Sequence, residues 1–129
     1  MWKIKVDNMQ TQFIKKMSKV EAGFHLLMIV SLVDGKMQQA ESDVILDFIN
    51  DHFDGEINLI KEQAFLRALP ESEREKHFIE TAEHFYSIST EDERHTLTRF
   101  AMEVAMADED MQTHENKFIN KLYDCWAIE

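Results

Sequence analysis

Residues that make tight turns are scarce in this sequence, which has three glycines and one proline among 129 residues. A protein of many short strands needs a turn signal about every 8–12 residues, so the scarcity argues against a β-rich fold. Met, Leu, Ala, Glu, Lys and Gln, which favour helices, are plentiful. A chain of this length normally forms one domain with a real core. We therefore expect an all-α protein of one domain.

Cysteine and basic charge are also scarce. Cys125 is the single cysteine, so no intrachain disulfide can form and a reducing cytoplasm is favoured. We expect Cys125 to act as a partly buried small hydrophobe. Lys and Arg number 14 against 25 Asp and Glu, which gives a formal net charge of −11. This charge disfavours nucleic acids and anionic membrane surfaces as partners, and it is compatible with a cation or a basic protein partner.

Long hydrophobic runs are missing as well. The most apolar stretch, 24–33, is interrupted by His25 and Ser31 and falls short of the ~20 residues that cross a bilayer. The first six residues lack the apolar core of a secretory signal. We expect a cytoplasmic protein with no direct membrane insertion.

Helical periodicity is the dominant pattern along the chain. It predicts about seven helices, over 8–17, 19–34, 39–53, 57–69, 73–86, 91–107 and 113–126. Capping-box patterns begin at Ser18, Ser72 and Thr90. The 19–34 stretch is apolar nearly all round, which is typical of a helix at the centre of a core. We expect residues 1–17 to form a tail and a first helical segment, and residues 18–129 to form the helical domain.

One acidic phrase occurs twice. The octet from Asp34 to Glu41 reappears as Asp108 to Glu115, 74 residues further along (34 to 108). Apolar positions around the phrase repeat with the same offset, for example Ile45 with Ile119. Each copy lies between two apolar helical stretches. The sequence therefore predicts a bundle with two internally repeated, antiparallel helical hairpins, each with an acidic corner.

The repeated acids predict a cation site. Asp34 and Asp108 are expected at the C-terminal ends of helices, where the macrodipole disfavours a carboxylate by roughly 0.3–1 kcal/mol. Glu41 and Glu115 are expected in the first turn of the next helix, where an acid is favoured, and a tight corner brings both ends together. The alternative is structural, since these acids can also cap backbone N–H groups within the corner.

The second corner is the stronger metal candidate. We expect Asp108 and Glu115 to be the primary ligands with Asp110 in support, while Asp34 and Glu41 form a weaker equivalent site in which Lys36 offsets charge. Oxygen ligands favour Ca²⁺ or Mg²⁺, and the neighbouring His114 would admit Mn²⁺, Fe²⁺ or Zn²⁺.

Two common metal motifs do not fit the spacing. An EF-hand loop needs a Glu at its twelfth position, where this chain has Ile45 or Ile119. A ferritin-like di-iron bundle needs Glu-x-x-His, which does not occur in the chain.

The two phrases give the chain a family resemblance. Leu32–Gly35 with Glu41, and Ala105–Asp108 with Glu115, resemble the paired Asp-Gly…Glu phrases of the TerB-like (tellurite resistance protein B) domain, over about residues 18–126. The resemblance implies a duplicated all-helical fold, an acidic metal-binding surface at Asp34, Glu41, Asp108 and Glu115, and a role in bacterial stress or tellurite resistance. The chain departs from the family pattern at Glu109, where glycine is usual, and this alters the turn expected at the second corner.

Other residues predict no separate chemistry. We expect His25 to be a core or rim histidine and both His84 and His95 to lie at the surface. No nucleophile setting or phosphate-binding glycine loop is present, so we expect a non-enzymatic protein. The alternative function is a protein–protein interaction module, in which an acidic face or a Met-lined groove docks a basic or helical partner. The sequence favours no particular oligomeric state.

Overall fold

A computed structural model describes residues 14, 16–31, 39–53, 55–107 and 117–126, with the backbone alone given at 39–42, 104–107 and 117. This part of the chain contains six α-helices and no strand, which confirms the all-α class. The helices are α2 (Lys19–Ser31), α3 (Gln39–His52), α4 (Leu59–Ala68), α5 (Glu71–Ile88), α6 (Glu91–Ala107) and α7 (Lys117–Trp126). The predicted helix at 8–17 and the strand-like tail lie almost wholly outside the described residues.

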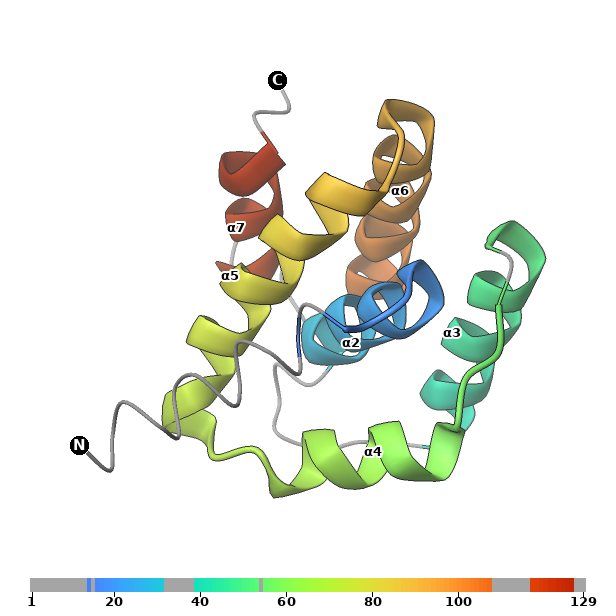
Figure 1. Ribbon diagram of the computed structural model, residues 1–129, viewed down its shortest axis with the longest axis vertical. Helices are drawn as coiled ribbons and strands as arrows, with labels where there is room; N and C mark the ends of the chain where they lie inside the picture. The colour runs from blue at the N-terminus through green and yellow to red at the C-terminus, as the bar shows by residue number, and fades with distance from the viewer. Residues whose placement is uncertain (1–13, 15, 32–38, 54, 108–116, 127–129) are drawn as a thin grey trace.

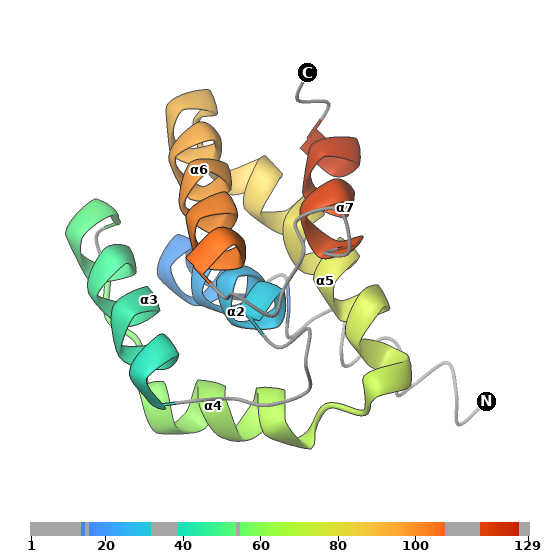
Figure 2. The same cartoon turned by 180° about the vertical axis from the view of Figure 1, so that it is seen from behind.

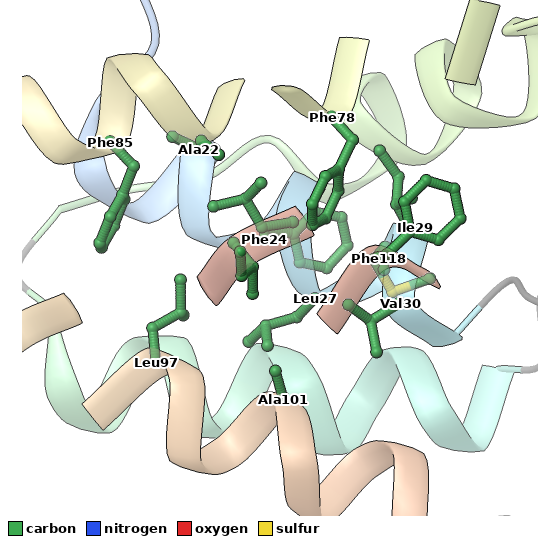
Figure 3. Packing of buried hydrophobic residues seen from close by; sticks show 14 of the residues in the cluster. Ala22, Phe24, Leu27, Ile29, Val30, Phe78, Phe85, Leu97, Ala101 and Phe118 are labelled. Carbon is green, nitrogen blue, oxygen red and sulfur yellow. The ribbon is translucent and has the colours of Figure 1, made fainter. Parts of the chain in front are cut away.

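Helix α2 runs through the middle of the molecule, as its all-round apolar sequence predicted (Figure 1). Every residue of α2 except Lys19 and Glu21 is buried. It contacts all five of the other described helices, most extensively α5 and α3. Figure 3 shows Phe24 and Leu27 of α2 surrounded by apolar side chains of α5, α6 and α7. Burial of about 25 cal/mol per Å² of apolar surface in this core is the main force that stabilises the fold.

The predicted duplication is visible as contacts between equivalent positions. Residues that are 74 positions apart meet where α2 packs on α6: Lys19 with Glu93, Gly23 with Leu97, and Leu27 with Ala101 (Figure 3). The Lys19 ammonium lies 3.0 Å from the Glu93 carboxylate, and a Cβ at Gly23 would lie 3.6 Å from Leu97 Cδ1. Equivalent residues of two copies contact each other where an approximate twofold axis passes between the copies. The two copies of the repeat are therefore packed against each other through their first helices.

Two of the three predicted capping boxes are confirmed. Ser18 Oγ accepts from the Glu21 N–H at 3.2 Å, and Glu21 Oε1 accepts from the Ser18 N–H at 2.9 Å. Thr90 and Glu93 make the same reciprocal pair at the start of α6, at 3.2 and 2.8 Å. The box predicted at Ser72 is wrong. Helix α5 begins two residues earlier than predicted, at Glu71, with Pro70 as its N-cap and no side-chain cap. Proline suits a helix start because its φ is helix-compatible and it has no N–H to satisfy.

The apolar residues of α4 do not all lie on its buried face. Ile60 is 80 % exposed, and Ala64 and Ala68 are exposed as well. The buried residues of α4 are instead Glu62, Gln63 and Leu66. Figures 1 and 2 show α4 at one edge of the molecule, where it joins α3 to α5. Polar side chains therefore make a large part of its contact with the core, beside the apolar Leu59, Phe65 and Leu66.

Candidate functional site

The predicted metal ligands lie mostly beyond what the structure describes. Asp34, Asp108, Asp110 and Glu115 lie outside the described residues. Glu41 is the third residue of α3, in its first turn as predicted, and only its backbone is described. Among the described residues, no group of three or more His, Cys, Asp or Glu side chains could hold a metal ion. The predicted ligand set therefore stays a prediction.

The helices that flank the two corners are described, and their ends lie near one another. Helix α2 contacts both α6 and α7. In Figure 3, Val30 at the end of α2 lies beside Phe118 at the start of α7. Figure 2 shows the last turns of α2 and α6 and the first turn of α7 at the same side of the molecule. Three of the four helix ends that flank the two acidic phrases therefore lie in one region of the fold.

A second candidate site lies in the interior, where a chain of three titratable side chains links three helices. His25 on α2 lies between Glu62 on α4 and His77 on α5. His25 Nε2 is 2.9 Å from Glu62 Oε1, and His25 Nδ1 is 2.9 Å from His77 Nε2. Thr81 Oγ1 lies 3.4 Å from the same His77 nitrogen. We call Glu62, His25 and His77 the buried triad.

The buried triad is shielded from solvent on all sides. Glu62 and His25 are 0 % exposed and His77 is 6 % exposed. The Phe65 ring lies 5.5 Å from the His25 ring and 5.1 Å from the His77 ring, so an apolar side chain covers the contact. Glu62 Oε2 has no hydrogen-bond partner among the described residues. Leaving a buried polar atom unpaired is costly, and native proteins keep few such atoms.

Each contact in the triad must contain one donated hydrogen. Neutral imidazole donates from one nitrogen and accepts at the other, whereas imidazolium donates from both. Only one of His25 Nδ1 and His77 Nε2 can therefore carry a hydrogen while the 2.9 Å contact persists. Burial, together with the smaller effect of the nearby His25, lowers the pKa of His77 from 6.5 to about 3. His77 is thus neutral at neutral pH.

The same geometry argues against a metal ion bound by all three side chains. His25 uses its two ring nitrogens on opposite partners, with Glu62 on one side and His77 on the other. One ion would need nitrogen and oxygen atoms that converge on a single point at about 2.0–2.2 Å. The arrangement instead resembles a hydrogen-bonded chain through which the protonation of one group affects the next.

The sequence carries a signal for this triad, although the sequence-based predictions did not include it. Glu62 lies three residues after Leu59 and four before Leu66, so it falls within an apolar helical stripe. His77 precedes Phe78, and Ala82 and Phe85 follow on the same buried face. His25 is a core histidine as expected, but its partners lie 37 and 52 positions away. Periodicity within one helix cannot identify such partners.

The remaining predicted residues have ordinary roles. Cys125 is partly buried, as expected, and burial raises the pKa of its thiol, with Glu83 and Asp124 acting in the same direction. His95 is exposed, as expected. His84 is partly buried, and its Nε2–H donates to the Met17 carbonyl at 2.8 Å. It therefore connects α5 to the residues before α2.

The methionines whose side chains are described belong to the core. Met17 and Met28 are buried, and Met102 packs against the same cluster. None of the described helices is long and apolar enough to cross a membrane.

The fold and the repeated corners define a class, the small, internally duplicated all-helical domains. Within this class the comparison with protein families is specific. The family described as "Tellurite resistance protein TerB" matches residues 20–129, and the chain belongs to this family. No significant match was found among curated proteins or among solved structures.

Proposed function

We propose that this TerB-like domain is a non-enzymatic, cytoplasmic protein that binds a divalent cation at its repeated acidic corners, in a bacterial stress response of the tellurite-resistance type. The observation that carries the proposal is the repetition of Asp34 and Glu41 as Asp108 and Glu115. Membership of the TerB family supports it.

The fold adds a physical argument. The helices that carry the repeat pack on each other through equivalent residues, such as Lys19 and Glu93. The ends of α2 and α6 and the start of α7 lie at one side of the molecule (Figure 2). The acids of both phrases contribute to the net charge of −11, and like charges repel one another. A divalent cation offsets this repulsion, and carboxylate oxygens suit Ca²⁺ or Mg²⁺.

Calorimetric titration with Ca²⁺, Mg²⁺, Mn²⁺ and Zn²⁺ tests the proposal. We expect one of these ions to bind tighter than about millimolar, which corresponds to roughly 4 kcal/mol of binding free energy. The double variant Asp108→Asn with Glu115→Gln should weaken binding at least about tenfold, or 1.4 kcal/mol. The pair Asp34→Asn with Glu41→Gln should have a smaller effect, because Lys36 already offsets charge at that corner.

The matched control removes two acids elsewhere. Asp47 and Asp51 are exposed on α3, one helical turn apart, and Asp47→Asn with Asp51→Asn should change the affinity less than about twofold, the effect of general charge alone. If no ion binds tighter than millimolar, or if the corner variants match this control, the cation function is wrong. The interaction-module alternative would then be preferred.

A further inference from the structure

We propose that the buried triad is a proton-sensitive latch that holds α4 on α2 and α5, so that acid releases α4 from the otherwise folded domain. The inference does not depend on cation binding. It rests on the position of the triad between three helices and on the small amount of apolar contact that α4 makes.

Helix α4 is attached through the triad and a small apolar contact. Three of its ten residues are buried, and two of these three, Glu62 and Gln63, are polar. Leu66 and the partly buried Leu59 and Phe65 supply the apolar contact. The helix lies at the edge of the molecule, on the far side from α7 (Figures 1 and 2). Elements with few buried apolar contacts open at a lower free energy than the core does.

The closed contact limits how many protons the triad can hold. One hydrogen lies between Glu62 and His25, and one lies between His25 and His77. If both rings became imidazolium, two N–H groups would face each other at 2.9 Å, and two positive charges would be buried together. When α4 opens, the triad is exposed to water and both rings can be charged. Acid therefore favours the open form.

Among the described residues, the titratable side chains buried in the interior are the members of the triad. Each packing helix contributes one titratable group: His25 from α2, Glu62 from α4 and His77 from α5. The charged residues three or four positions from these on the same helices are all partly exposed, namely Glu21 on α2 and Glu73, Arg74 and Glu80 on α5. Solvent screens their effect on the interior.

Native-state hydrogen exchange of the full chain at pH 7.5 and pH 5.0 tests the latch. His77 has a pKa of about 3 in the closed form and an ordinary value of 6.5 when exposed. The equilibrium constant for opening therefore rises about tenfold for each pH unit below 6.5. After correction for the intrinsic exchange rate, the opening constant of the α4 amides should rise about 30-fold between these pH values. The amides at the centres of α2 and α6 exchange only through global unfolding and should stay more protected than those of α4 at both pH values.

Two variants separate the latch from a general effect of acid. His77→Gln keeps an acceptor for His25 and removes the titratable ring, so the pH effect on α4 should fall below about threefold. His95→Gln removes an exposed histidine on α6 and should retain the 30-fold effect. The proposal is overturned if α4 is equally protected at both pH values, if His77→Gln retains the effect, or if the α4 amides are as protected as those of α2 and α6 at pH 5.0.

A measurement on the unmodified protein covers the case in which His77→Gln does not fold. Nitrogen chemical shifts of the histidine rings at pH 5.0 should show His77 neutral in the closed form. A charged His77 in the closed form would contradict the latch.

Discussion

Among single residues, Glu62 is unusual as an acidic side chain in the interior. Its carboxyl group is fully buried, one of its oxygens is unpaired, and the other bonds to a histidine. A buried pair of this kind adds little net stability over an apolar pair of the same shape. Removal of one member, however, leaves the other without a partner in the interior. The triad is therefore a sensitive point in an otherwise apolar core.

Glu62→Ala should lower the free energy of unfolding by about 3 kcal/mol, because it leaves His25 Nε2 unpaired and opens a cavity. Glu62→Gln keeps an oxygen acceptor and should cost about 1 kcal/mol. Urea unfolding followed by circular dichroism measures both. Glu83, which is exposed on α5, gives the control, since Glu83→Ala should lie within about 0.5 kcal/mol of the parent. Equal effects of the two alanine variants would mean that the Glu62 contact is not formed.

Glycine has a steric role at two positions. In α2, a Cβ at Gly23 would lie 3.0 Å from Ile49 Cδ1, so glycine permits the close approach of α3. Gly55 has a φ of +140°, and a Cβ there would lie 2.9 Å from Val20 Cγ2. This region of φ strongly favours glycine. Gly55 thus allows the chain to turn between α3 and α4 directly against the central helix.

At the scale of elements, the helix starts show how local chemistry and tertiary position combine. Glu93 caps α6 through the Thr90 N–H and also binds Lys19 of α2. Burial alone would raise the pKa of the Glu93 carboxyl group, but its bonds to Thr90 and Lys19 together lower it. One carboxylate therefore both begins a helix and joins the two halves of the duplication.

Thr90 and Ser72 both match the capping-box pattern, but only Thr90 caps a helix, so the two residues give a matched comparison. Thr90→Ala removes a cap that is present and should destabilise the protein by about 1 kcal/mol. Ser72→Ala changes a residue that matches the same sequence pattern but lies inside α5 without capping it, so its effect should stay within about 0.5 kcal/mol. Thermal or urea unfolding of both variants makes the comparison. A loss at Ser72 as large as that at Thr90 would contradict the start of α5 at Glu71.

At the scale of the whole molecule, His77 links global stability to pH. Its folded pKa of about 3 is below the ordinary 6.5, so the unfolded chain binds more protons between these values. The contribution of His77 to the free energy of unfolding is complete above pH 6.5 and is lost as the pH falls toward 3. The Glu93 carboxyl group, whose pKa is also lowered, adds a loss that begins only below about pH 4.5, near its ordinary value.

We therefore expect the free energy of unfolding to fall by about 2 kcal/mol between pH 7.5 and pH 5.0 through His77, at 1.36 kcal/mol per pKa unit. Urea unfolding at the two pH values measures the change. The His77→Gln variant should lose less over the same interval, and the difference between the two proteins isolates this residue. If both proteins show the same pH dependence, His77 does not titrate as its burial requires.

Much of the fold could be predicted because its signals are local. The bounds of α6 match the predicted 91–107, α3 ends one residue before the predicted limit of 53, and the caps at Ser18 and Thr90 formed as expected. The position of α2 at the centre followed from its all-round apolar sequence. The 74-residue repeat predicted two related helix pairs, and the contact of Lys19 with Glu93 is consistent with this duplication.

The sequence by itself determined the helical class, the central helix, the duplication and the family, because periodicity, capping and repetition are properties of neighbouring residues or of the chain compared with itself. Only the tertiary structure decided that α4 turns Glu62 inward and leaves Ile60 exposed. It also decided that Glu62 meets His25 and His77. A helical pattern limits which residues share a face, but the choice of the buried face depends on partners from distant helices, and these partners meet only when the chain folds.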